Sequence, residues 1–294
     1  MKSLEELADT TTALVPEIIP EIWSAELEKA ANAKRIARNL IRTYTTLRDG
    51  PGDILRVPKQ GKIDAVGLTE GTDITPTALD YGELVLTPAE VGAAVRVTKD
   101  VVENSIIDVL RDATEQLGEA LAQKEDRDIL ADLAGPTGHI LYGGDASSAA
   151  TLVQGDVLTT DMIASGVALI REDNFEPDCF VIHPIQERIL LKDAQFTDAS
   201  QYGSQEPVLK GEIGKYLGLK VIVSTNVQNP AVDVHSCVLM DAKRAGAIAV
   251  KRDATVDTDY EVLKRSHLIV GTMKYDAGVL NDLAICAIVV HDKE

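Results

Sequence analysis

Histidine and cysteine are the residue types best suited to chemistry in this 294-residue sequence, which holds five histidines and three cysteines. A metal site or a catalytic base needs partners at a fixed spacing, and none of these residues has them. His183 is the most site-like, because it ends an apolar stretch and precedes Pro184. No Cys, Asp or Glu partner is fixed near it by spacing. The sequence therefore predicts no catalytic residue, no cofactor and no metal site.

Longer motifs of catalysis and ligand binding are also missing. The chain has neither a G-x-S-x-G nucleophile turn nor a G-x-x-x-x-G-K-[ST] phosphate loop. Its three cysteines, Cys179, Cys237 and Cys286, are scattered through apolar, strand-like runs. This placement is typical of buried, reduced thiols in an intracellular protein. We therefore expect a protein that is not an enzyme.

The charge balance of the sequence disfavours some classes of binding partner. The formal net charge is −18, with 47 acidic against 29 basic residues. Gripping nucleic acid or an anionic membrane surface needs clustered Lys and Arg, so both classes are disfavoured. No apolar run approaches the roughly 20 residues that cross a bilayer. The first twelve residues carry acids and no apolar signal core, so we expect no export.

A locally basic segment stands out in this acidic chain. Residues 21–47 have helical periodicity, with Trp23 on the apolar side and Arg35 and Arg38 among the cations. The pattern predicts an amphipathic helix. Its basic face is either simply solvated or belongs to an arm that docks on an acidic neighbour.

Residues 99–133 predict the central element, one uninterrupted helix of about 35 residues and roughly 50 Å. Apolar residues, Ile106 among them, recur at helical spacing and form a buried stripe. Asp100 is the expected N-cap, and Gly135-Pro136 is a strong stop signal. A helix of this length suggests a spine against which other parts pack.

Residues 59–82 lie between two strand-like stretches and are rich in Gly and Thr. So long an unstructured loop is unusual inside a compact domain. We interpret it as a projecting hairpin that another subunit orders, with Lys59 and Lys62 as contact residues. The alternative is a mobile surface loop.

The second half of the chain changes in composition. Residues 136–244 alternate strand and helix patterns, which predicts a small α/β subdomain that includes a strand at 178–183. From Cys237 onward the pattern is almost entirely strand, with turns expected at 252–254 and 276–278. These strands need a covering helix, and the spine is the obvious one.

Two short motifs in this order of elements carry a family resemblance. Phe180-Val181-Ile182-His183-Pro184 looks like a strand-to-helix signature, and residues 211–218, leading into the strand at 219–224, look like a second. Together with the basic arm, the Gly/Thr hairpin and the spine, they give a chain that resembles the major capsid proteins of tailed phages. Those proteins have the Hong Kong 97-type fold.

The resemblance implies an α+β fold in four parts. Residues 1–48 would be an N-terminal arm and 49–88 an extended β-hairpin loop. Residues 89–135 and 245–294 would form a peripheral domain that combines the spine helix with a β-sheet. Residues 136–244 would be an inserted α/β axial domain.

The implied function is that of a major capsid protein, the self-assembling structural subunit of an icosahedral phage head that encloses double-stranded DNA. It would be a virion protein assembled in the host cytoplasm. Its partners would be copies of itself in pentamers and hexamers, with scaffolding, portal and decoration proteins as further candidates. Packaged DNA would make only weak, non-specific contact, and no membrane is involved. The expected inter-subunit contacts are Trp23, Arg35, Arg38, Lys59 and Lys62.

Two alternatives remain open at this point. One is an encapsulin-like nanocompartment shell that holds a cargo enzyme. The other is a hydrolase or binding enzyme with an α/β core, in which His183 would matter. Some relatives of the resembled family also join subunits through a Lys-Asn bond. No motif marks such a pair among Lys59, Lys62 and Asn281, and we expect no crosslink.

Overall fold

The structure is a computed structural model that describes residues 27–28, 31, 35–48, 52–60, 81–135, 138–192 and 215–293. The chain divides into two compact units. The first unit includes Ala89–Lys124 and Lys251–Tyr275, and the second includes Ile36–Pro88, Glu125–Val250 and Asp276–Glu294. Each is described below by itself.

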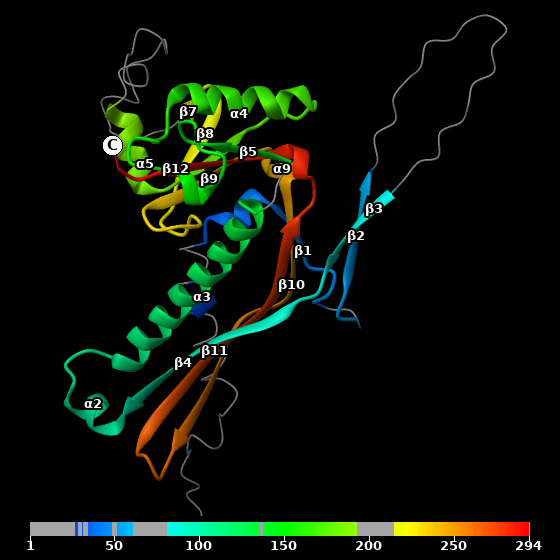
Figure 1. Cartoon of the computed structure of the whole chain (residues 1–294). Coiled ribbons are helices and arrows are strands. Elements are labelled where there is room, and N and C mark those ends of the chain that lie inside the picture. The colour runs from blue at the N-terminus through cyan, green and yellow to red at the C-terminus, as the bar shows by residue number, and fades with distance from the viewer. Residues whose placement is uncertain are drawn as a thin grey trace, which may run out of the picture. The chain divides into compact units, whose positions relative to one another are not determined.

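The described elements mix helices and strands throughout the chain (Figure 1). In chain order they are η2 (Ala37–Leu40), β1 (Arg42–Tyr44), β2 (Leu55–Gln60), β3 (Tyr81–Leu86), β4 (Ala89–Thr98), α2 (Lys99–Asn104), α3 (Val109–Leu133), β5 (His139–Tyr142), η3 (Ala149–Thr151), α4 (Thr160–Glu172), β6 (Cys179–Ile182), α5 (Pro184–Lys192), β7 (Lys215–Tyr216), β8 (Leu219–Val223), β9 (Val234–Met240), α9 (Ala242–Ala245), β10 (Gly246–Glu261), β11 (Ser266–Val279), η4 (Asp282–Ala284) and β12 (Ile285–His291).

A six-stranded sheet forms the centre of the second unit, in the order β5-β12-β9-β6-β8-β7. β12 pairs antiparallel with β9 and parallel with β5, and β6 pairs parallel with β8. Every residue of β6 and β9 is buried. The all-apolar sequence of β6 is typical of a strand covered on both faces, whereas β9 also buries His235 and Ser236. The sheet takes five of its strands from residues 136–244 and one, β12, from the C-terminal segment that was expected in the peripheral domain.

Two helices share one hydrophobic core with this sheet. Ile163 and Ile170 of α4 and Leu190 of α5 belong to the same buried cluster as Phe180 of β6. The N-terminus of α4 is capped by Thr159, whose hydroxyl accepts a hydrogen bond from the Met162 amide at 3.3 Å. The helices thus cover the face of the sheet that carries these side chains.

The first unit contains long paired strands. β11 pairs antiparallel with β4 from Ser266↔Thr98 to Tyr275↔Ala89. The turn expected at 252–254 is wrong, because β10 runs unbroken through it, with Ala254 and Val256 alternating inward. The turn expected at 276–278 is also wrong, because β11 continues to Val279. In both cases strand pairing overrides the local turn preference of Asp and Gly.

The predicted spine helix is two helices. α2 ends at Asn104, and Ser105 has extended backbone angles, φ −80° and ψ 141°. α3 begins at Val109, and the Asp108 carboxylate accepts a hydrogen bond from the Arg111 amide at 3.3 Å. Asp108 therefore takes the capping role expected of Asp100. Ile106 lies in the break and is fully exposed rather than part of a buried stripe.

The helix predicted for residues 21–47 is wrong in its second half. This part forms η2 and then β1, which pairs parallel with the start of β10, Arg42 opposite Ala247. The reason lies on α3, where the buried Asp126 carboxylate accepts hydrogen bonds from the amides of Ile36 and Ala37 at 3.0 and 2.9 Å. This tertiary contact fixes the start of η2, after which the chain enters the sheet.

Removing Arg38 tests how much this anchoring contributes to stability. Its guanidinium lies 2.6 Å from the Glu125 carboxylate, whose side chain is fully buried. Arg38→Ala should lower the free energy of unfolding of the subunit by about 3 kcal/mol, because a buried charge loses its partner. Urea unfolding followed by circular dichroism measures this. Arg56→Ala, which breaks an exposed pair with Glu83, is the control and should cost less than about 1 kcal/mol. Equal losses in the two variants would contradict the assignment.

Replacing Asp132, near the end of α3, with an uncharged residue should stabilise the folded protein. Burial, and then the charges of Asp276 and Asp128, raise the pKa of its carboxyl from 3.8 to about 6. The folded state therefore binds this proton more readily than the unfolded state, and stability is lost as the pH rises from 3.8 through 6. Asp132→Asn should raise the thermal midpoint at about pH 7 and lose this advantage near pH 4. Asp145→Asn, at an exposed carboxylate, should give no such gain.

Candidate assembly surfaces

His183, the most site-like residue of the sequence, lies between β6 and α5 in a small buried network of the second unit. Its ring stacks on that of His235 from β9, with ring centroids 3.9 Å apart. His235 Nδ1 lies 2.8 Å from Oδ1 of buried Asp292, and Gln186 Nε2 donates to the same oxygen at 2.8 Å. Asp292 is 57 residues from His235, so spacing in the sequence gave no sign of it.

Within the described residues, the contacts of this network hold separate segments of the chain together. A His-carboxylate pair can orient a catalytic base, but in the described part of the chain no hydroxyl or thiol is hydrogen-bonded to either ring. The described residues also contain no group of three His, Cys, Asp or Glu side chains able to hold a metal ion. What the network does is tie the segment after β12 to the start of α5.

The three cysteines are poorly suited to act as nucleophiles. Cys179, Cys237 and Cys286 are all buried and free. Burial raises the pKa of each of these thiols to about 12, so the reactive thiolate is scarce at neutral pH. The expectation of buried, reduced thiols is confirmed.

The stacked histidines predict a loss of stability in acid. Burial and the neighbouring His235 lower the pKa of His183 from 6.5, and Asp292 opposes this. The folded state therefore resists protonation, so stability is complete above pH 6.5 and is lost as the pH falls through that value. His183→Phe keeps a ring for stacking without a titrating group. It should lose less thermal stability than the parent between about pH 7 and pH 5. His267→Phe, whose ring neighbours Tyr260 rather than a histidine, should behave like the parent.

The predicted hairpin is present where the structure describes it. β2 and β3 pair antiparallel from Leu55↔Leu86 to Gln60↔Tyr81. Its foot is anchored, because Leu86 is buried in a cluster with Leu47, Ala247 and Ala249. Within the described residues this ribbon has two strands, and neither outer edge pairs there with a further strand. Residues 61–80 lie outside the described part.

The five expected inter-subunit residues fall in different environments. Trp23 and Lys62 lie outside the described residues. Lys59 lies on β2 and is half-buried, whereas Arg35 is buried and Arg38 pairs with Glu125 of its own chain. Part of the basic face of the arm therefore points inward, because Glu125 of α3 supplies a buried carboxylate for Arg38. Spacing in the sequence could not reveal this pair. The inter-subunit role of all five stays a prediction.

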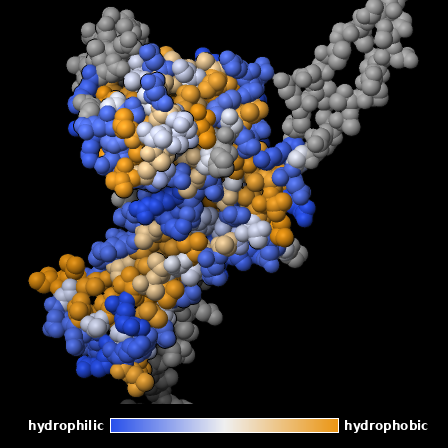
Figure 2. All heavy atoms as spheres, in the orientation of Figure 1, coloured by the Kyte–Doolittle hydropathy of each residue, from blue (hydrophilic) through white to orange (hydrophobic). Residues whose placement is uncertain are grey.

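The sequence missed an exposed apolar surface in the first unit, which we call the apolar tip. It combines the break between α2 and α3 with the turn between β10 and β11. The start of α2 is joined to the turn between β10 and β11. The Lys99 amide donates to the Arg265 carbonyl at 2.9 Å, and the Arg265 guanidinium lies 3.6 Å from the Asp100 carboxylate. Figure 2 shows hydrophobic residues gathered in this part of the surface. The members are Val101, Ile106, Ile107, Tyr260, Val262 and Leu263.

Two members of the apolar tip are as exposed as a side chain can be. The relative accessibility is 103% for Ile106 and 101% for Leu263. Isolated surface apolar residues are ordinary, but several large exposed ones in one part of the surface are typical of an interaction surface. The adjacent pair Ile106-Ile107 was a usable signal in the sequence, but helical periodicity placed Ile106 in a buried stripe.

Comparisons with known proteins identify the family and the fold of this chain. A family model described as phage capsid protein matches residues 81–288, which is more than half of the chain. The comparison with curated proteins gave no match. The capsid of cyanophage P-SCSP1u is 18% identical with a TM-score of 0.66, over 86% of this chain and 87% of that chain. The cyanophage Pam1 capsid is 15% identical with a TM-score of 0.71, over 86% and 88%. The capsid of a native GTA particle is 13% identical with a TM-score of 0.63, over 89% and 90%.

These likenesses define the fold as that of a phage capsid subunit. The chain belongs to the phage capsid protein family. The resemblance to the major capsid proteins of tailed phages is thereby confirmed, and so is a mixed α/β fold. The encapsulin-like alternative is not favoured, since the family model that matches describes phage capsid proteins and cyanophage capsids are among the solved structures that match. Among the described helices, none is both long and apolar enough to cross a membrane.

Proposed function

We propose that this chain is the self-assembling subunit of an icosahedral, Hong Kong 97-type head that encloses double-stranded DNA. The observation that carries the proposal is the family match over residues 81–288, and the fold shared with assembled capsids supports it. The subunit acts as a building block of the virion, put together in the host cytoplasm from pentamers and hexamers.

The apolar tip supplies a driving force for such assembly. Burying a side chain such as Ile106 or Leu263 contributes about 1.5–3 kcal/mol. A contact of this size is weak alone, but every subunit repeats it, so a closed shell gains it many times over. The tip thereby favours a state in which another copy covers it.

The hairpin and the arm are the other contacts of the proposal. The extended loop, with Lys59 and Lys62 as contact residues, reaches across a neighbouring subunit, and its β2–β3 ribbon adds main-chain hydrogen bonds there. The arm, with Trp23, Arg35 and Arg38, belongs to residues 1–48. Residues 49–88 form the extended loop, and the peripheral (89–135, 245–294) and axial (136–244) domains complete the subunit. Scaffolding, portal and decoration proteins are further partners.

The acidic charge fits a container for DNA. A net charge of −18 keeps the wall from gripping phosphates, and gripping would oppose packaging and release. Contact with the packaged DNA is accordingly weak and non-specific.

An assembly experiment tests the proposal. The purified chain should form closed particles of uniform size, seen by electron microscopy and sedimentation velocity. Ile106→Asp combined with Leu263→Asp should raise the protein concentration needed for assembly by about tenfold or more, because each contact then buries a charge. Thermal melts of the unassembled subunit should stay unchanged, since both side chains are exposed in it.

The matched control is Val232→Asp, at a valine of the second unit that is 87% exposed. This variant should assemble like the parent. A parent chain that stays monomeric under every assembly condition would contradict the proposed function. Nuclease-protected DNA inside native particles separates a head from a cargo compartment.

A further inference from the structure

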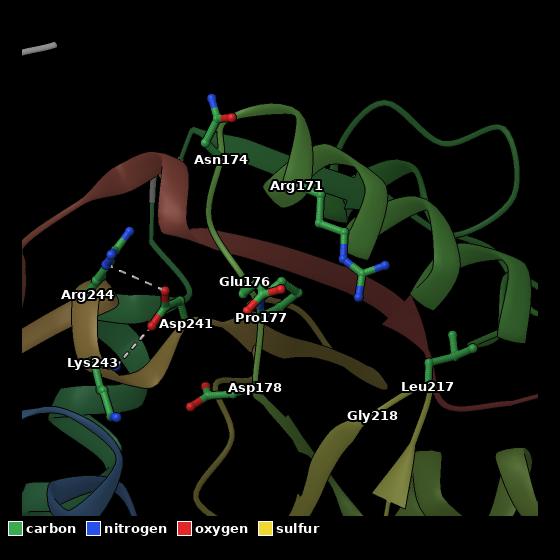
Figure 3. Close-up of a pocket in the computed structure, with 10 residues that line it drawn as sticks. All are labelled: Arg171, Asn174, Glu176, Pro177, Asp178, Leu217, Gly218, Asp241, Lys243 and Arg244. Carbon is green, nitrogen blue, oxygen red and sulfur yellow. Dashed lines mark hydrogen bonds and ion pairs between the residues drawn. The ribbon is translucent and has the colours of Figure 1, made fainter.

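A polar pocket of the second unit carries charges of both signs. It has a volume of about 630 Å³ and lies where the end of α4, the loop before β6, the turn between β7 and β8, and α9 meet (Figure 3). Arg171 and Lys243 lie on opposite sides of it, and its lining balances three cations against three carboxylates. This balance favours neither an anionic nor a cationic partner, so the inference below concerns a different surface.

The outer strand of the four-stranded sheet, β4, is long and unprotected at its edge. It pairs with β11 on one side, and within the described residues no strand pairs with its other side (Figure 1). That edge is ten residues long. Natural edge strands are commonly blunted by proline, lysine or a bulge. Residues 91–97 read Val-Gly-Ala-Ala-Val-Arg-Val instead, with Arg96 as their one charge. Such an edge is suited to receive another strand.

The two faces of β4 are buried to different extents. The odd-numbered residues from 91 to 97 are half-buried or buried. Gly271, opposite Ala93 on β11, lies against Leu117 and Leu121 of α3. The even-numbered residues from 90 to 98 are exposed on the other face. A strand added at this edge therefore continues a surface with one face toward the core and one toward solvent.

The exposed face of β4 carries one charge of each sign, toward opposite ends of the strand. Glu90 pairs with Arg252 of β10, and Arg96 pairs with Glu261 of the same strand at 2.9 Å. The side chains of Glu90 and Arg96 remain 58% and 46% exposed in these pairs. Each can therefore contact a second charge without leaving the first.

We propose that β4 pairs antiparallel with β4 of a second copy, about a two-fold axis at Ala93. In this register Glu90 of each copy lies directly opposite Arg96 of the other, and Val91 lies opposite Val95. A shift by two residues in either direction removes both charge contacts, so the order of charges along the strand selects this alignment. The two sheets become one, joined by backbone hydrogen bonds across a self-complementary interface.

Self-complementarity identifies the occupant as a second copy. The exposed row across the paired strands reads Arg252 and Glu90 from one copy, then Arg96 and Glu261 from the other, with alternating sign. The net charge of −18 opposes the approach of two copies. Physiological salt largely screens charges more than about 8 Å apart, whereas directly opposite side chains are closer neighbours. The inference rests on the proposed function and names one contact within the shell.

Charge reversal tests the register. Glu90→Arg alone, or Arg96→Glu alone, sets like charges opposite each other. Each variant should raise the protein concentration at which copies associate about tenfold, measured by sedimentation velocity. An equimolar mixture of the two variants should associate near the parent's concentration, and so should the chain that carries both substitutions, because opposite charges again face each other. Arg188→Glu, at an exposed arginine of α5, is the matched control and should associate like the parent.

The doubly substituted chain separates a contact between copies from a role within one subunit. Its pairs with Arg252 and Glu261 stay broken, so its thermal midpoint should remain below the parent's while association recovers. Single variants that associate like the parent overturn the inference and leave the proposed function standing, as does a double variant that fails to recover. A parent chain that stays monomeric overturns both.

Proline at adjacent positions tests the use of the backbone edge. Successive amides of a strand point to opposite edges, so one of Ala93→Pro and Ala94→Pro loses a hydrogen bond to β11 and the other loses a donor at the outer edge. The outer-edge variant is the one whose thermal midpoint lies closer to the parent's, and it should fail to associate at the parent's concentration. Normal association of that variant overturns the inference. If it fails to associate while charge reversal has no effect, a different strand occupies the edge and the inference is wrong.

Discussion

Two acidic side chains that α3 buries, Glu125 and Asp126, fix much of the second unit. An unpaired carboxylate inside a protein is costly, so each needs a specific partner. Arg38 supplies a cation to Glu125, and the amides of Ile36 and Ala37 supply hydrogen bonds to Asp126. η2 then leads into β1, which pairs parallel with the start of β10. These polar contacts therefore hold the chain where it enters the sheet.

The two units differ in how completely they bury their apolar side chains. In the second, β6 and β9 are buried on both faces, and α4 and α5 share a core with the sheet. In the first, large apolar residues remain at the surface of the apolar tip, in segments that a hydrogen bond and an ion pair join. When another copy covers such a surface, the apolar area leaves water and the free energy of the system falls. This is the physical basis for interpreting the chain as part of a shell.

The second unit also holds a buried polar network. The contacts of His183, His235 and Asp292 lie within their own chain, and they fasten the segment after β12. A buried network of this kind stabilises one fold. The geometry therefore gives a structural role to His183, although this histidine looked most like a site in the sequence.

Local pattern alone determined the elements whose signals are short and consistent. Pro184 began α5, Thr159 capped α4, and the apolar runs at 179–182 and 219–223 became strands of the sheet. The order of these elements was enough to identify the capsid resemblance. The break at Ser105, which leaves Ile106 exposed, is accompanied by the local cap that Asp108 provides for α3, and helical periodicity did not reveal it. Tertiary structure decided what depends on distant residues, namely the unbroken course of β10 and the inward turn of Arg38, where strand pairing and buried Glu125 outweighed the local preference. Spacing along one segment carries no information about such contacts.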